Sequence, residues 1–88
     1  MVTMYIGMND KDLHKQVKSA RYFKQEIAKE MDCTIFECTG IYKGEIEKSL
    51  KIEVFGKTAK ECREIARRLC VKFNQESIIV NGKFITAA

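Results

Sequence analysis

The sequence predicts an α+β fold of the ferredoxin-like type, βαββαβ, in which two helices lie on one face of a four-stranded antiparallel sheet. Three observations predict it. Apolar residues recur at every second position in some segments and at every third or fourth in others, a capping box precedes the second helical segment, and glycine turns separate the alternating segments. Residues 1–88 form a single ferredoxin-like domain, because two halves of an 88-residue chain could not each bury a core.

The first two elements are a short strand at residues 4–6, which ends at Gly7, and a helix from about residue 11 to residue 30. Asn9 and Asp10 supply oxygens and negative charge that suit the start of that helix. The helical spacing of apolar residues is kept by Leu13, Val17, Ala20, Ile27 and Met31.

Two alternating segments, residues 34–42 and 49–55, predict an antiparallel hairpin with residues 43–44 as its turn. In the first segment we expect Phe36 to face the helices and Ile35 and Ile41 to face away from them. In the second segment the apolar positions Leu50, Ile52 and Val54 should face the helices.

The second helix follows the capping box from Thr58 to Glu61. Its apolar stripe consists of Cys62, Ile65, Ala66, Leu69 and Phe73. Residues 57–72 contain six basic and two acidic residues, so this segment alone accounts for the formal net charge of +4 of the whole chain. Lys60, Arg63 and Arg67 are three and four residues apart, a spacing that places them on one helix face.

The last core strand is predicted at residues 77–80, with Ile79 facing the helices. Asn81-Gly82 then precedes another apolar segment, and Asn-Gly in that position is typical of a two-residue hairpin turn. Either the final segment folds back as a small hairpin, or Asn81-Gly82 forms a bulge that a tail follows.

The sheet face that carries no helix should expose several apolar side chains, and such patches usually mark an interface. We therefore expect a homo-oligomer that is built at least partly through this face. The predicted interface residues are Tyr5, Ile35, Ile41, Phe55, Ile78 and Val80.

No residues have the spacing of a catalytic or a metal site. The four cysteines form no CxxC pair and the chain has one histidine, His14, so we predict reduced, metal-free and buried thiols and no cofactor. No acid, nucleophile and orienting group can be identified around His14, which favours a protein that is not an enzyme. The sequence contains no signal peptide and no membrane-spanning run, so we expect a cytoplasmic protein.

The basic helix face is the candidate binding surface. Lys60, Arg63 and Arg67, together with Tyr22 or Tyr42, would suit a nucleotide in a cleft between subunits, because guanidinium groups match phosphates and aromatic rings stack on bases. The alternative is a small nucleic-acid-binding protein, which the predicted fold and the basic charge support only weakly, since the glycine-aromatic motif of RNA-reading domains is absent from residues 49–55.

Four segments, residues 5–12, 38–44, 47–54 and 73–77, resemble a family of small uncharacterised proteins of phages and prophages of Gram-positive bacteria. The resemblance implies an accessory protein that acts in a bacterial host cytoplasm. It also implies a non-catalytic, anti-defence role, in which an oligomer inhibits a host factor by binding a protein or by sequestering a nucleotide signal. No functional residue is carried over from this family.

Overall fold

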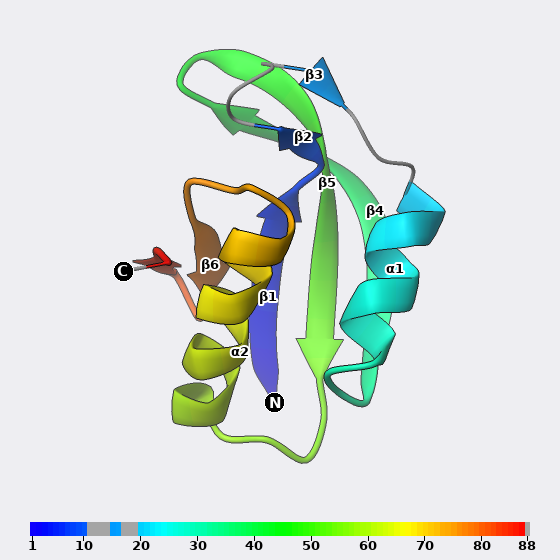
Figure 1. Ribbon diagram of the computed structural model, residues 1–88, viewed down its shortest axis with the longest axis vertical. Coiled ribbons are helices and arrows are strands. Elements are labelled where there is room, and N and C mark those ends of the chain that lie inside the picture. The colour runs from blue at the N-terminus through cyan, green and yellow to red at the C-terminus, as the bar shows by residue number, and fades with distance from the viewer. Residues whose placement is uncertain (11–14, 17–19, 88) are drawn as a thin grey trace.

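The computed structural model describes residues 1–10, 15–16 and 20–87 and shows two helices packed on a sheet (Figure 1). The helices are α1 (Ala20–Ala28) and α2 (Ala59–Lys72). The strands are β1 (Val2–Gly7), β2 (Asn9–Asp10), β3 (Lys15–Gln16), β4 (Cys33–Tyr42), β5 (Glu45–Val54), β6 (Ile78–Val80) and β7 (Lys83–Ile85).

The main sheet has the strand order β4-β5-β1-β6-β7, and all neighbouring strands are antiparallel. Both helices lie on the same face of this sheet, with α1 in front of β4 and β5 and α2 in front of β1 and β6 (Figure 1). The prediction of an α+β fold with two helices on an antiparallel sheet is confirmed. The four-stranded ferredoxin-like form is not, because β7 adds a fifth strand and β2 and β3 pair in a separate two-stranded sheet.

The fifth strand arises from the Asn-Gly turn. Asn81 and Gly82 have φ angles of 48° and 82°, and two positive values in succession are the geometry of a type I′ hairpin turn. The Asn81 side chain also accepts a hydrogen bond of 3.0 Å from the backbone N–H of Thr3, which ties this turn to β1. Of the two alternatives for the chain end, the hairpin is therefore the one that forms.

The first helix is shorter than predicted. It begins at Ala20, and Asn9 and Asp10 pair with β3 in the small sheet rather than capping a helix. Leu13 and Val17 of the predicted stripe lie outside the described residues, as does His14. The predicted stripe is confirmed at Ile27, which is fully buried.

The second helix forms as predicted. Thr58 caps it: its hydroxyl oxygen accepts a hydrogen bond from the backbone N–H of Glu61 at 3.2 Å, and the Glu61 carboxylate accepts one from the backbone N–H of Thr58 at 2.9 Å. The whole apolar stripe from Cys62 to Phe73 is buried. Two ion pairs, Lys72–Glu26 at 2.8 Å and Arg68–Glu30 at 3.1 Å, connect α2 with the end of α1 and the turn that follows it.

The facing of two strands differs from the prediction. In β4, Ile35 pairs with the buried Ile52 and packs against the core, whereas Phe36 faces away from the helices and is 46% exposed. In β6, Ile78 and Val80 are buried and Ile79 faces the other side. The β6 error has a simple cause: three consecutive apolar residues show no alternation, so only the pairing of Val80 with Met4 decides which of them enters the core.

The face without helices carries one row of side chains across all five strands. Cross-strand partners place Phe36, Lys51, Tyr5, Ile79 and Phe84 in this row, from β4 to β7. Three of them are aromatic, and all three are more than one third exposed. No helix within the described part of the chain is long and apolar enough to cross a membrane.

Candidate active site

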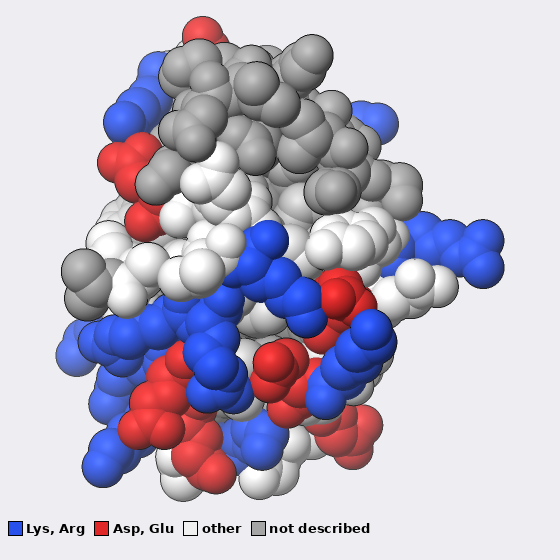
Figure 2. All heavy atoms as spheres, viewed as in Figure 1, with Lys and Arg blue, Asp and Glu red and all other residues white. Residues whose placement is uncertain are grey.

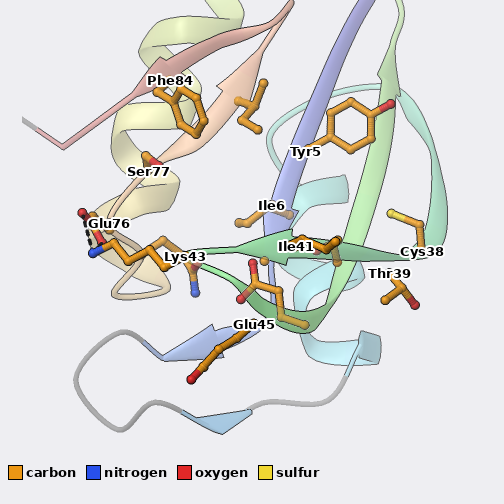
Figure 3. Close-up of a pocket in the computed structure, with 16 residues that line it drawn as sticks. Tyr5, Ile6, Cys38, Thr39, Ile41, Lys43, Glu45, Glu76, Ser77 and Phe84 are labelled. Carbon is orange, nitrogen blue, oxygen red and sulfur yellow. Dashed lines mark hydrogen bonds and ion pairs between the residues drawn. The ribbon is translucent and has the colours of Figure 1, made fainter.

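A cavity of about 350 Å³ lies where the β4–β5 hairpin, β1 and the loop before β6 come together (Figure 3). The hairpin contributes the end of β4 and the start of β5, from Cys38 to Ser49, and β1 contributes Tyr5 to Gly7. The loop after α2 contributes Gln75 to Ser77, and Ile79 and Phe84 of the C-terminal hairpin complete the described lining. The cavity thus joins segments from both ends of the chain.

Two glycines open space for polar side chains in this cavity. A Cβ atom on Gly7 would collide with the carboxylate oxygen Oε1 of Glu47 and lie only 2.9 Å from its Cδ. A Cβ atom on Gly40 would lie 3.0 Å from the hydroxyl oxygen of Ser49. The Glu47 carboxyl and the buried Ser49 hydroxyl therefore occupy room that exists because residues 7 and 40 have no side chains.

The cavity is acidic although the chain is basic. Its described lining contains three carboxylates, Glu45, Glu47 and Glu76, and one basic side chain, Lys43. Burial raises the pKa of the Glu47 carboxyl above its ordinary value of 4.5. A positively charged group placed beside this carboxylate would replace part of the lost solvation, so the cavity suits a cationic ligand.

One ion pair spans the edge of the cavity. The Lys43 ammonium lies 3.1 Å from Glu76 Oε2 and 3.5 Å from Oε1, and the two residues are separated by 33 positions in sequence (Figure 3). Lys43 occupies the turn of the β4–β5 hairpin and Glu76 the loop before β6. The pair therefore links two segments that no sheet pairing connects.

Aromatic and apolar groups form the rest of the lining. Tyr5 and Phe84 are 38% and 64% exposed, and the side chain of Ile79 lies in the same cross-strand row between them. Flat apolar groups can stack on such rings, and a heteroaromatic base is a typical partner. The cavity thus combines an acidic side with an apolar and aromatic side.

The predicted binding residues lie elsewhere. Lys60, Arg63 and Arg67 are on α2, in the layer that covers the opposite sheet face, and Figure 2 shows lysine and arginine side chains gathered over that helix, with acidic ones among them. In the part of the chain that the structure describes, no ion pair to a carboxylate is found for these three residues. None of them lines the cavity. Whether this face binds a ligand stays a prediction.

Of the two predicted tyrosines, the structure places Tyr22 far from Lys60 within one chain. Tyr22 packs edge-on against Phe23 and Phe73, with centroid distances of 6.1 and 5.9 Å. Phe73 follows the last residue of α2, whereas Lys60 is in its first turn, about 20 Å away along the helix. Tyr42 is the last residue of β4, and its side chain is outside what the structure describes.

The surroundings of the cysteines favour a structural role over a reactive one. Cys62 and Cys70 are buried in the core, and the Cys70 thiol donates a hydrogen bond of 3.5 Å to the carbonyl of Ile85. Burial raises the pKa values of Cys62 and of the half-buried Cys33, which disfavours the reactive thiolate. Among the described residues, no three His, Cys, Asp or Glu side chains are placed to hold a metal ion. Cys38 is half-buried at the cavity.

Fold and cavity together describe a small α+β protein with an acidic, partly aromatic pocket. The family model of the S-adenosylmethionine lyases matches residues 6–84, and the chain belongs to this family. No curated protein and no solved structure matches the chain significantly. The match includes every described cavity residue except Tyr5.

The family overturns the functional interpretation of the sequence. The matched family is one of enzymes that cleave S-adenosylmethionine. The assignment to uncharacterised phage proteins is therefore wrong. The non-catalytic anti-defence role and the nucleic-acid-binding alternative are wrong for the same reason. The expectation of a small nucleotide-like ligand is correct in its coarse form, since S-adenosylmethionine is such a molecule.

The sequence did contain a signal for the site. The four segments that carry the phage resemblance include every described cavity residue except Glu45, Ile79 and Phe84. Periodicity alone makes Glu45 and Glu47 ordinary polar positions of a strand, and it makes Gln75 and Glu76 chiefly the end of a helix. In the structure, the Gln75 backbone N–H donates a hydrogen bond of 2.9 Å to the Cys70 carbonyl at the end of α2.

Proposed function

We propose that this protein cleaves S-adenosylmethionine in the cavity between the β4–β5 hairpin, β1 and the loop before β6. The observation that carries the proposal is the local excess of carboxylates, at Glu45, Glu47 and Glu76, in a chain whose formal net charge is +4. The substrate has a sulfonium and an ammonium group, one carboxylate and an adenine ring. An acidic pocket with exposed aromatic rings complements that set of groups.

Glu47 is the residue that we assign to a positive group of the substrate. Its carboxyl is partly desolvated, and a cation at hydrogen-bond distance restores the interaction that burial removes. Tyr5 and Phe84 supply ring faces for the adenine. The cavity volume of about 350 Å³ lies at the lower end of the range for small-molecule sites, in keeping with a substrate of this size.

The chemistry of a lyase requires little from the protein. The bond between carbon and the sulfonium sulfur breaks, the electron pair of that bond moves to sulfur, and a neutral thioether leaves. The carbon fragment either loses a proton or closes onto its own carboxylate, and no water is consumed. Positive charge disappears from sulfur during this step, so a site that excludes water favours it, whereas positioning of the remaining groups holds the reactive conformation.

The test is direct. Purified protein is incubated with S-adenosylmethionine in water enriched in ¹⁸O, and the earliest products are identified by mass spectrometry. We expect loss of substrate and the appearance of a neutral thioether and a carbon fragment that contains no ¹⁸O. The masses of these two products should add up to the mass of the substrate, because no water is added. Incorporation of ¹⁸O in the earliest product would indicate hydrolysis, and absence of any loss above spontaneous decay would refute the proposal.

Two variants locate the reaction. Glu47→Gln keeps the shape of the side chain but removes its charge, and it should lower kcat/KM by about tenfold or more, as expected for loss of a charged hydrogen bond. The matched control is Glu64→Gln, which removes an exposed carboxylate on α2 and should leave kcat/KM unchanged. Equal losses in both variants would argue against this cavity as the site.

A further inference from the structure

We propose that Lys43 determines specificity by binding the carboxylate of the substrate's amino-acid part, and that Glu76 positions the Lys43 ammonium for this contact. The inference rests on the proposed function and adds a recognition element to the same cavity. It concerns which sulfonium compounds the site accepts.

Lys43 is the only basic side chain in the described lining of the cavity. The other charged groups of the described lining are the carboxylates of Glu45, Glu47 and Glu76, which repel an anionic group of the ligand. S-adenosylmethionine has one carboxylate, and an ammonium donor is the group in this lining that can compensate its charge. The one lysine of the described lining thus matches the single negative group of the substrate.

The position of Lys43 is set by the hairpin turn. Lys43 and Gly44 have φ angles of 51° and 81°, which is the two-residue turn geometry with positive φ at both positions. This turn holds the lysine at the end of the hairpin, on the side where its side chain extends to Glu76 (Figure 3). The contact with Glu76 therefore places the Lys43 ammonium at the cavity edge, where the side chains of the two residues are 69% and 50% exposed.

Glu76 has two effects on Lys43. Its carboxylate lies 3.1 Å from the ammonium and limits the positions that the flexible side chain can take. It also offsets the charge of Lys43, so that the lysine does not repel a substrate with two positive groups. An ammonium has three donor hydrogens, so Lys43 can donate to Glu76 and to a ligand carboxylate together.

The test compares two ligands that differ in the carboxylate alone. We measure KM for S-adenosylmethionine and the inhibition constant of decarboxylated S-adenosylmethionine, each from the rate of substrate loss. The variant Lys43→Asn removes the ammonium and keeps the fold, since Asn-Gly is the preferred sequence for a turn of this geometry. Lys43→Arg keeps a positive charge, and Lys48→Met removes an exposed lysine of β5 that is outside the cavity lining.

We expect Lys43→Asn to raise KM about tenfold or more and to change the inhibition constant of the decarboxylated compound by less than about threefold. Lys43→Arg should keep at least part of the preference for the carboxylate, and Lys48→Met should behave as the parent. Glu76→Gln should raise KM to a smaller extent, and the double variant Lys43→Asn/Glu76→Gln should show no further increase over Lys43→Asn.

Each outcome separates the two proposals. If the parent protein cleaves S-adenosylmethionine and Lys43→Asn keeps the parent ratio of the two constants, the role of Lys43 is refuted and the proposed function stands. An equal rise of the KM for S-adenosylmethionine and of the inhibition constant of the decarboxylated compound also refutes the role of Lys43. Such a result would indicate a general change of the hairpin and not the loss of a contact with the carboxylate. If the parent does not cleave S-adenosylmethionine, both proposals fail.

Discussion

Replacing Gly7 with alanine tests whether the position of the Glu47 carboxylate controls the cleavage of S-adenosylmethionine. The new Cβ would lie 2.9 Å from Cδ of Glu47, whereas carbon atoms in ordinary contact are about 3.5–4.0 Å apart. The carboxyl group must therefore retreat by roughly 0.6–1.1 Å. A displacement of about 1 Å in a catalytic constellation can cost up to about 100-fold in rate, but here the loss cannot exceed that of removing the Glu47 charge. We therefore expect kcat/KM to fall by about tenfold, and by no more than in Glu47→Gln.

The same substitution should not weaken the fold. The atom that Cβ meets is the end of a flexible glutamate side chain, which can move, and Gly7 is not among the residues with positive φ. Alanine in a strand is favoured over glycine by roughly 0.5–1 kcal/mol. The melting temperature of Gly7→Ala should therefore equal or exceed that of the parent, which separates the loss of activity from unfolding.

The assay is a double-mutant cycle on kcat/KM with Gly7→Ala, Glu47→Ala and both together. If alanine at position 7 acts by displacing the carboxylate, it should add less than about threefold to the loss in the Glu47→Ala background. Full additivity of the two losses would refute the reasoning, as would a Gly7→Ala variant with the activity of the parent.

Further results concern the dependence on pH, the cap of α2, the oligomeric state and the basic face of α2. Burial raises the pKa of Glu47 above its ordinary value of 4.5, and a bound cation lowers this pKa again. The affinity for S-adenosylmethionine should therefore rise with pH as Glu47 ionises, and binding should release a proton from Glu47. Calorimetry should detect this proton release in the parent and not in Glu47→Gln. Because burial raises the pKa of Glu47, the folded state holds the Glu47 proton more tightly than the unfolded chain, and the free energy of unfolding of the parent should fall as pH rises through the raised pKa. Denaturant unfolding at a series of pH values should show this fall in the parent and not in Glu47→Gln. Thr58→Ala should lower the free energy of unfolding by about 1 kcal/mol and the melting temperature by about 4–8 °C, with kcat/KM at room temperature unchanged; an unchanged melting temperature would contradict the role of the cap. We propose that a second copy packs against the helix-free sheet face at Phe36, which is outside the cavity lining, so light scattering should give a multiple of 10.2 kDa that Phe36→Glu lowers, and a monomeric parent would end this idea. Arg63→Glu with Arg67→Glu should leave cleavage within about twofold of the parent and stability within about 0.5 kcal/mol, whereas lost cleavage would make the basic face part of the site.

Local signals in the sequence were sufficient for the parts of the fold that depend on neighbours in the chain. The capping box at Thr58 and the stripe from Cys62 to Phe73 predicted α2 because both act within one or two helical turns. The Asn81-Gly82 and Lys43-Gly44 pairs marked turns, since each requires a backbone conformation that these residue types favour.

Other features depended on pairing across the sheet. Ile35 and Phe36 are adjacent, and the register that joins Cys33 to Val54 decided which of them enters the core. The same applies to Ile78 and Ile79 beside β1. The alternation within one strand could not decide these cases. A shift of one residue exchanges the side chains that face the core with those that face away, and here both neighbouring positions are apolar, so either arrangement would bury an apolar side chain.

Function was hidden for a chemical reason. The search for a nucleophile, a metal site or an acid–base pair failed because a sulfonium substrate already contains its leaving group, so its cleavage needs a shaped and charged cavity rather than a motif. The cavity that we propose as this site is lined by Gly7, Lys43, Glu47 and Glu76, which lie up to 69 positions apart in sequence. The sequence by itself determined α2 with its basic charge and the β4–β5 hairpin. Only the tertiary structure decided which carboxylates meet, because the position of a side chain in a sheet depends on strand order and register.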